Sequence, residues 1–123
     1  MPRSGSTLVE SIISLNNKVK DLGEINILEK AFTKSRNCNQ KISLTDLYIQ
    51  EINQIAKGFS ITSNKWLYNY QYAGIIAKEI LNSKIIHCFR NPLDNILSIH
   101  RANFHVGNYY SSSLIDSTKV YLD

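Results

Sequence analysis

Cysteines, prolines and long apolar runs are scarce in this chain of 123 residues. Its two cysteines, Cys38 and Cys88, form no CxxC pair, which argues against a disulfide framework and a cysteine-based metal site. No apolar stretch approaches the ~20 residues of a membrane span, and the N-terminus lacks the basic and apolar regions of a secretory signal. We therefore expect a reduced, cytoplasmic protein without a membrane span.

Metal-binding clusters of carboxylates are also missing, as is the lysine of the GxxxxGK(S/T) loop of nucleoside triphosphatases. The chain carries 14 Lys and Arg against 10 Asp and Glu, which gives a net charge of +4. That charge suits an anionic ligand and nucleic acid alike, and the cations are scattered along the sequence. Hydrophobic residues make up 43% and charged residues 20%, which predicts one folded domain over residues 1–123 rather than a disordered chain.

The N-terminus carries a short Gly/Ser loop, residues 2–7, that leads directly into an amphipathic helix. A helix N-terminus offers unpaired backbone N–H groups and the positive end of the helix dipole, which together attract anions. Ser6 and Thr7 add hydroxyl donors, and Arg3 adds a fixed charge that can bind an oxyanion with two hydrogen bonds. The segment predicts a phosphate site, and the plain alternative is a helix cap.

A second segment, residues 85–98, joins an apolar strand to a new helix. Arg90 stands at the end of the strand, Asn91 and Pro92 are typical of a helix start, and Ser98 follows within the helix. The pattern predicts a second anion site, although Arg90 and Ser98 are also compatible with ordinary structural roles. Two such sites on one small domain predict a ligand with two separated phosphate-like groups.

The other apolar positions predict helices alternating with short strands. We expect helices near 8–16, 27–35, 44–57, 68–81 and 92–104, a last helix from Ser112 or Ser113, and strands at 59–62 and 84–89. This alternation is typical of an α/β layer with a parallel sheet. Because no residues before Met1 supply the strand that normally precedes such a loop, we expect a piece of a larger domain.

These segments resemble the sulfotransferase superfamily, whose donor is 3′-phosphoadenosine-5′-phosphosulfate (PAPS), and most of all its bacterial tetratricopeptide-linked and tyrosylprotein-type branch. The family's PRSGTTL loop is matched by residues 2–8, with Ser6 in place of Thr, and its Arg…Ser pair by Arg90 and Ser98. The branch's Gly-Glu and Asn/Asp-Lys pairs fall in the same order at Gly23-Glu24 and Asn64-Lys65. The resemblance implies a three-layer α/β/α fold with a central parallel sheet, of the P-loop nucleotide-hydrolase kind.

The resemblance also implies a role for each matched residue in sulfuryl transfer to an acceptor hydroxyl, without a metal ion. The 5′-phosphate is held by four loop residues: Ser4, Gly5, Ser6 and Thr7. Arg3 and Lys65 face the sulfuryl group and the leaving oxygen, and Glu24 takes the proton of the acceptor. Arg90 and Ser98 bind the 3′-phosphate.

Several alternatives stay open from the sequence. The acceptor is a carbohydrate, a peptide tyrosine or a small metabolite, and the chain is either an active enzyme or a nucleotide-binding remnant without turnover. A basic nucleic-acid binder is the third reading. We expect His87 to pack within its strand and His100 and His105 to lie at the surface. The resemblance implies a secondary phosphate contact close to Arg101.

Overall fold

The computed structural model describes residues 1–37, 42–102, 104 and 107–123, which form two compact units. The central unit comprises Thr7–Ile86. The terminal unit comprises Met1–Ser6 and His87–Asp123. The first residues of the chain therefore belong with its C-terminal third, and each unit has its own buried side chains.

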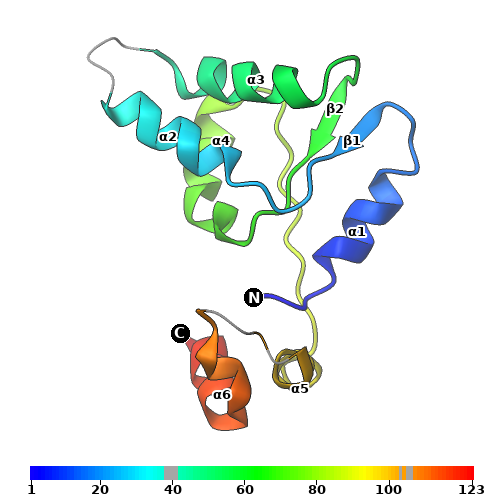
Figure 1. Ribbon diagram of the computed structural model, residues 1–123, viewed down its shortest axis with the longest axis vertical. Helices are drawn as coiled ribbons and strands as arrows, with labels where there is room; N and C mark the ends of the chain where they lie inside the picture. The colour runs from blue at the N-terminus through cyan, green and yellow to red at the C-terminus, as the bar shows by residue number, and fades with distance from the viewer. Residues whose placement is uncertain (38–41, 103, 105–106) are drawn as a thin grey trace. The chain divides into compact units, whose positions relative to one another are not determined.

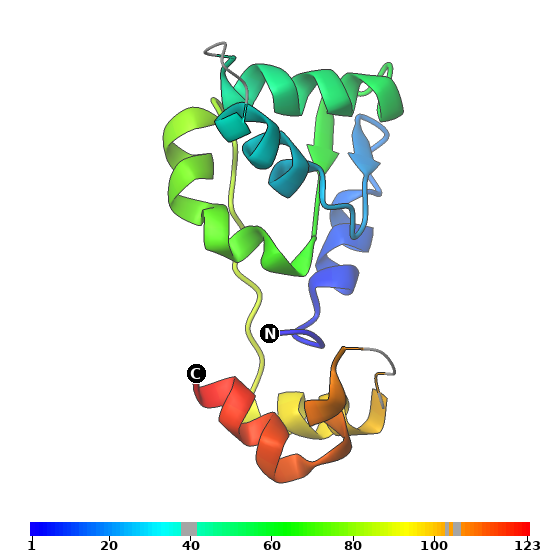
Figure 2. The same ribbon diagram turned by 60° about the vertical axis from the view of Figure 1, so that its left-hand side comes forward.

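Three helices build the core of the central unit: α2 (Ile27–Asn37), α3 (Leu44–Ile55) and α4 (Ala73–Glu79) (Figures 1 and 2). A 3-10 helix, η1 (Leu67–Tyr72), leads into α4. The buried contacts between α2 and α3 come from Leu28, Ala31, Leu44 and Leu47. Partly buried side chains from η1 and α4 pack against this cluster, so the three predicted helices share one apolar core.

The central unit also contains a short sheet of two strands, β1 (Val19–Asp21) and β2 (Ile61–Ser63). The strands are parallel, with Val19 opposite Ile61 and Asp21 opposite Ser63. Both strands therefore end at the same edge of the sheet. The loops that leave this edge carry Gly23-Glu24 and Asn64-Lys65.

The first helix, α1 (Ser6–Ile13), begins at Ser6, the last residue of the N-terminal segment of the terminal unit, and continues into the central unit. The sequence predicts that this helix buries its apolar side chains and exposes its charged one, and the structure shows the reverse. Leu8 and Ile12 are 66% and 58% exposed, whereas the Glu10 side chain is buried. The expected apolar face of this helix is therefore not a core face.

The terminal unit consists of α5 (Pro92–Ala102), a 3-10 helix η2 (Tyr109–Ser112) and α6 (Leu114–Leu122). The predicted start of α5 is confirmed, because Asn91 Oδ1 accepts a hydrogen bond from the Leu93 N–H at 3.0 Å. The start of the last helix is confirmed as well, since the Ser113 side chain caps α6 by accepting from the Asp116 N–H. Ile99 and Ser117 are fully buried in this unit.

The predicted three-layer α/β/α architecture is wrong. The described residues are mostly helical, and β1 and β2 are the only strands among them. The expected strand at 84–89 has no strand partner within the described chain, and Figure 2 shows the segment as an unpaired trace. A strand needs a neighbour for its backbone hydrogen bonds and its side chains, and Ile86 and Phe89 are 60% and 83% exposed here.

Candidate active site

An open pocket of about 390 Å³ lies within the terminal unit, along one face of α5. Its lining includes three arginines, Arg3, Arg90 and Arg101, together with Ser98 and Asp94. Positions 94, 98 and 101 fall on one side of a helix because they are spaced by three and four residues. Three guanidinium groups against one carboxylate give the pocket a positive field that suits a phosphate group.

The N-terminal loop contributes to this pocket through two hydrogen bonds to α5. The Arg3 guanidinium donates from Nε to Ser98 Oγ at 3.2 Å. The Asn95 amide, only 1% exposed, donates to the Pro2 carbonyl oxygen at 3.0 Å. The structure therefore brings together three residues singled out from the sequence, Arg3, Arg90 and Ser98.

The start of α1 carries the other loop residues expected to bind phosphate. Gly5 has a φ of +100°, a backbone conformation that favours glycine, and α1 begins at the next residue, Ser6. The Ser4 hydroxyl donates to the Met1 carbonyl oxygen at 3.0 Å. The first N–H groups of an α-helix have no partner inside the helix, so the start of α1 presents donors at Ser6 and Thr7.

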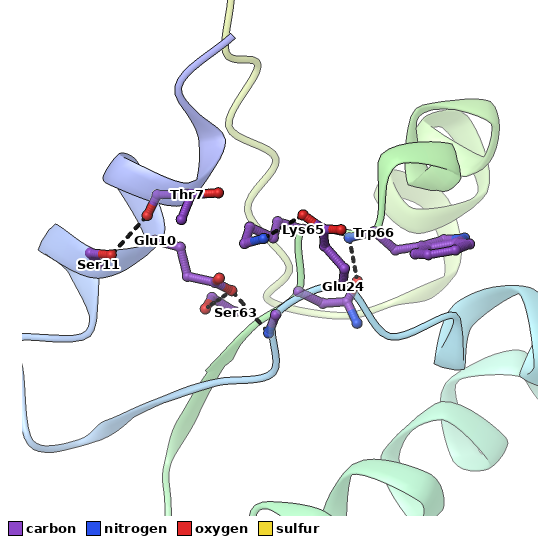
Figure 3. A network of polar contacts seen from close by, with 9 residues as sticks. Thr7, Glu10, Ser11, Glu24, Ser63, Lys65 and Trp66 are labelled. Carbon is purple, nitrogen blue, oxygen red and sulfur yellow. Dashed lines mark hydrogen bonds and ion pairs between the residues drawn. The ribbon is translucent and has the colours of Figure 1, made fainter. Parts of the chain in front are cut away.

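A carboxylate and an ammonium group form an ion pair at the carboxyl edge of the two-stranded sheet (Figure 3). Lys65 Nζ lies 2.7 Å from Glu24 Oε1. Glu24 follows β1 and Lys65 follows β2, and the Lys65 backbone N–H donates to the Gly23 carbonyl oxygen at 3.0 Å. Residues after the carboxyl ends of parallel strands are common positions for ligand contacts, and here they unite a proton acceptor and a cation.

The loop after β2 is fixed by the side chain of Asn64. Its Nδ2 donates to the Ile25 carbonyl oxygen at 2.9 Å, and its Oδ1 accepts from the Trp66 N–H at 3.1 Å and from Asn69 Nδ2 at 2.6 Å. The bond to Ile25 holds the loops after β1 and β2 to each other, and the other two fix the segment after β2. Lys65 therefore projects from a braced turn, and its side chain is only 16% exposed.

Three further residues at these sites escaped the sequence reasoning: Glu10, Asp94 and Asn95. The Glu10 carboxylate accepts hydrogen bonds from Ser63 Oγ at 2.9 Å and from the Gly23 N–H at 3.3 Å (Figure 3). A signal for it did exist, because Glu10 is the single charged residue in the sequence of α1. Asp94 and Asn95 had been considered only as parts of a helix start.

The two histidines that the structure describes, His87 and His100, differ in burial from what the sequence predicts. His87 is exposed rather than packed within a strand, because the strand is absent. His100 is half-buried rather than exposed, with Nδ1 3.0 Å from the Ser111 carbonyl oxygen. His105 and Cys38 lie outside the described residues, and Cys88 is a free thiol. Among the described residues, no three His, Cys, Asp or Glu side chains gather as metal ligands, and no helix is long and apolar enough to cross a membrane.

Comparison with known proteins gives one distant relative. An uncharacterized protein of Aquifex aeolicus (strain VF5) is 27% identical to this chain over 124 aligned positions. The alignment covers 85% of this chain and 16% of the relative, so the chain spans a small part of that protein's length. No protein-family model and no solved structure matches the chain.

The two clusters differ in their chemistry. The lining of the arginine pocket carries three positive charges and one carboxylate, Asp94, whereas the Glu24–Lys65 pair joins a carboxylate to a single cation. The pocket is suited to recognition of a phosphate. The pair is suited to moving a proton and to neutralising a nearby negative charge.

Proposed function

We propose that this chain transfers a sulfuryl group from PAPS to the hydroxyl group of an acceptor. The observation that carries the proposal is the arginine pocket of the terminal unit. Arg3 Nε and Ser98 Oγ are 3.2 Å apart although they are separated by 95 residues in sequence, and Arg90 lines the same pocket. These are residues of the two segments that resemble the donor-binding motifs of sulfotransferases.

The donor has two phosphate positions for these groups to bind. Arg90 and Ser98 hold its 3′-phosphate, which ordinary adenosine 5′-phosphates lack. Backbone N–H groups of the four residues before and at the start of α1 bind the 5′-phosphate: Ser4, Gly5, Ser6 and Thr7. The net positive charge of the pocket supports the first assignment, and the free N–H groups of a helix start support the second.

The transfer step needs a proton acceptor and stabilisation of the leaving group. The acceptor oxygen bonds to sulfur, the bond between sulfur and the bridging phosphate oxygen breaks, and adenosine 3′,5′-bisphosphate leaves. Glu24 takes the acceptor's hydroxyl proton, while Lys65 neutralises charge on the sulfuryl group and the bridging oxygen. Arg3, which lines the arginine pocket, adds positive charge to the binding of the donor. The sulfuryl group carries less charge than a γ-phosphate, so the step requires no divalent metal. The 2.7 Å ion pair supports this division of roles, because it places acid–base and cationic groups side by side.

The acceptor class stays open among carbohydrates, peptide tyrosines and small metabolites. Acceptor pockets are built from variable loops, and none of the described contacts selects among these three. A cytoplasmic setting belongs to the proposal, and the free thiol of Cys88 suits the reducing conditions there.

Donor recognition is tested by calorimetry with two ligands, adenosine 3′,5′-bisphosphate and adenosine 5′-phosphate. We expect the native chain to prefer the bisphosphate by about tenfold or more, as for a charge-assisted contact worth ~1.5–3 kcal/mol. Arg90→Ala should abolish this preference. Arg36→Ala is the matched control, because it removes the same charge from α2 in the central unit, outside the pocket. Equal affinity of the native chain for both ligands would contradict the proposal.

Turnover is tested separately by detecting sulfated product with a phenol, a tyrosine peptide and a monosaccharide as acceptors. Glu24→Gln should leave bisphosphate binding unchanged and lower the rate ~10²–10⁴-fold, the usual effect of removing a general base. A Glu24→Gln variant with the native rate would remove this carboxylate from the mechanism.

A second candidate function is nucleotide binding without turnover. It is favoured by the small sheet, which has two strands among the described residues, and by the exposed apolar side chains at 84–89. This candidate predicts the same preference for the bisphosphate but no sulfated product. The two experiments above therefore distinguish it from the active enzyme.

A further inference from the structure

Glu10 is a buried carboxylate for which sulfuryl transfer has no direct use. Its side chain belongs to a helix that exposes Leu8 and Ile12, so the helix buries its charge in preference to its apolar groups. Removing a carboxylate from water is costly unless hydrogen bonds replace the lost hydration. Such an arrangement calls for a reason beyond packing.

The hydrogen bonds of Glu10 end on Gly23, in the loop that carries Glu24, and on Ser63, the last residue of β2 before the loop that carries Lys65. One oxygen, Oε1, accepts from the Gly23 N–H at 3.3 Å and from Ser63 Oγ at 2.9 Å (Figure 3). Gly23 directly precedes Glu24, and Ser63 is two residues before Lys65. A single carboxylate oxygen therefore links the residue before Glu24 to the end of β2, close in sequence to both members of the ion pair.

Backbone hydrogen bonds join the same two loops. The Leu22 N–H donates to the Ser63 carbonyl oxygen at 2.9 Å, and the Lys65 N–H donates to the Gly23 carbonyl oxygen at 3.0 Å. Gly23 has a φ of +63°, a left-handed backbone conformation that favours glycine, and the chain bends at the next residue, Glu24. Glu10 contacts the N–H of Gly23, where a small rotation of the peptide would displace the Glu24 side chain.

We propose that Glu10 is a positioning residue, which ties the Gly23 backbone to Ser63 and so sets the distance between the Glu24 carboxylate and Lys65. The assignment rests on the proposed function, in which Glu24 accepts the proton and Lys65 stabilises the leaving oxygen. Misplacement of reacting groups by about 1 Å costs ~10²-fold in rate. Loss of Glu10 should therefore lower kcat and leave donor binding intact, because the side-chain hydrogen bonds described for Glu10 are to Gly23 and Ser63, which are not among the proposed donor-binding residues.

The variants Glu10→Leu, Glu10→Gln and Ser63→Ala test this role. Because both bonds end on one oxygen, the side-chain carbonyl of Gln can accept both, and Glu10→Gln should keep kcat within about fivefold of the native value. Glu10→Leu should lower kcat ~10–10²-fold with little change in the KM for PAPS or in the affinity for adenosine 3′,5′-bisphosphate. Ser63→Ala removes one of the two hydrogen bonds, so its kcat should lie between those of Glu10→Gln and Glu10→Leu. This variant tests the same role if Glu10→Leu does not fold.

Amide hydrogen exchange supplies a readout that does not depend on turnover. The Gly23 N–H should exchange at least about tenfold faster in Glu10→Leu than in the native chain, while amides of α3 keep their protection. Unchanged Gly23 exchange, or native kcat in both Glu10→Leu and Ser63→Ala, would overturn the positioning role. If the native chain makes no sulfated product while Gly23 exchange responds as expected, the proposed function fails and the loop lock survives.

Discussion

The pocket residue Asp94 shows how one side chain can serve stability and binding in opposite directions. It lies in the first turn of α5, where negative charge interacts favourably with the helix dipole. The same carboxylate lines the arginine pocket, where a bound phosphate would repel it. The Asp94 carboxylate should therefore lower the affinity of the pocket for an anion.

Replacing Asp94 by Asn should tighten the binding of adenosine 3′,5′-bisphosphate by a factor of about 1.4 to 5, the effect of an exposed charge pair worth ~0.2–1 kcal/mol. The same change should lower the free energy of unfolding by ~0.3–1 kcal/mol through the lost dipole interaction. Calorimetry and urea unfolding measure the two effects. Asp46→Asn is the matched control, because Asp46 occupies the first turn of α3 outside the pocket; equal tightening there would show a general effect of charge.

Among the elements, α3 holds the central unit together. It begins at the Ser43 cap and places Tyr48 against side chains of both apolar clusters in this unit. Burial raises the pKa of Tyr48 above its ordinary value of 10.0. The phenol is therefore held more firmly in its protonated form in the folded chain than in the unfolded chain.

The sign of the pH effect follows from that shift. The unfolded chain loses the Tyr48 proton near pH 10, below the pKa of the folded state, so the stabilisation is complete below pH 10 and is lost as the pH rises through the folded pKa. Tyr48→Phe should reduce the loss of stability between about pH 9 and about pH 11, as measured by urea unfolding. The exposed Tyr109, replaced by Phe, is the control and should leave the pH dependence unchanged.

The elements also show where sequence patterns succeed and fail. Local signals at Asn91-Pro92 and Ser113 predicted the starts of α5 and α6, because capping depends on a few neighbouring atoms. The strand at 84–89 failed because an apolar run reports composition and not the presence of a partner strand. The strand β1 was missed because Val19–Asp21 is three residues long and two of them are charged.

For the site residues too, the sequence predicted some placements and could not report contacts with distant parts of the chain. The order of the motifs anticipated that Glu24 and Lys65 belong together, and the structure places them 2.7 Å apart. The roles of Glu10 and Asn95 depend on contacts with backbone groups far along the chain, at Gly23 and at Pro2. No spacing rule within one helix reports such contacts.

For the whole molecule, the net charge of +4 leaves nucleic acid as a competing ligand. Non-specific binding to DNA depends on counterion release, so it weakens steeply with added salt and depends on many scattered cations. A pocket for one nucleotide depends on a few groups. The two modes therefore differ in how they respond to salt and to the loss of one arginine.

We expect adenosine 3′,5′-bisphosphate to bind more tightly than a single-stranded oligonucleotide at ~200 mM salt. Arg90→Ala should weaken the nucleotide at least about tenfold and change oligonucleotide affinity little. Fluorescence titrations of both ligands between ~50 and ~200 mM salt measure these effects. Oligonucleotide binding that is tighter throughout and insensitive to Arg90 would favour the nucleic-acid function.

The bond between Arg3 and Ser98 also has a consequence for biosynthesis. The residues that form the arginine pocket leave the ribosome at well-separated times, since Arg3 precedes Ser98 by 95 residues and Arg90 and Arg101 also follow far behind it. Contacts between such distant positions form slowly, because a long loop must close first. The sequences of α2 and α3 are therefore complete before the arginine pocket can form, and on the proposed function free donor cannot assist the early stages of folding.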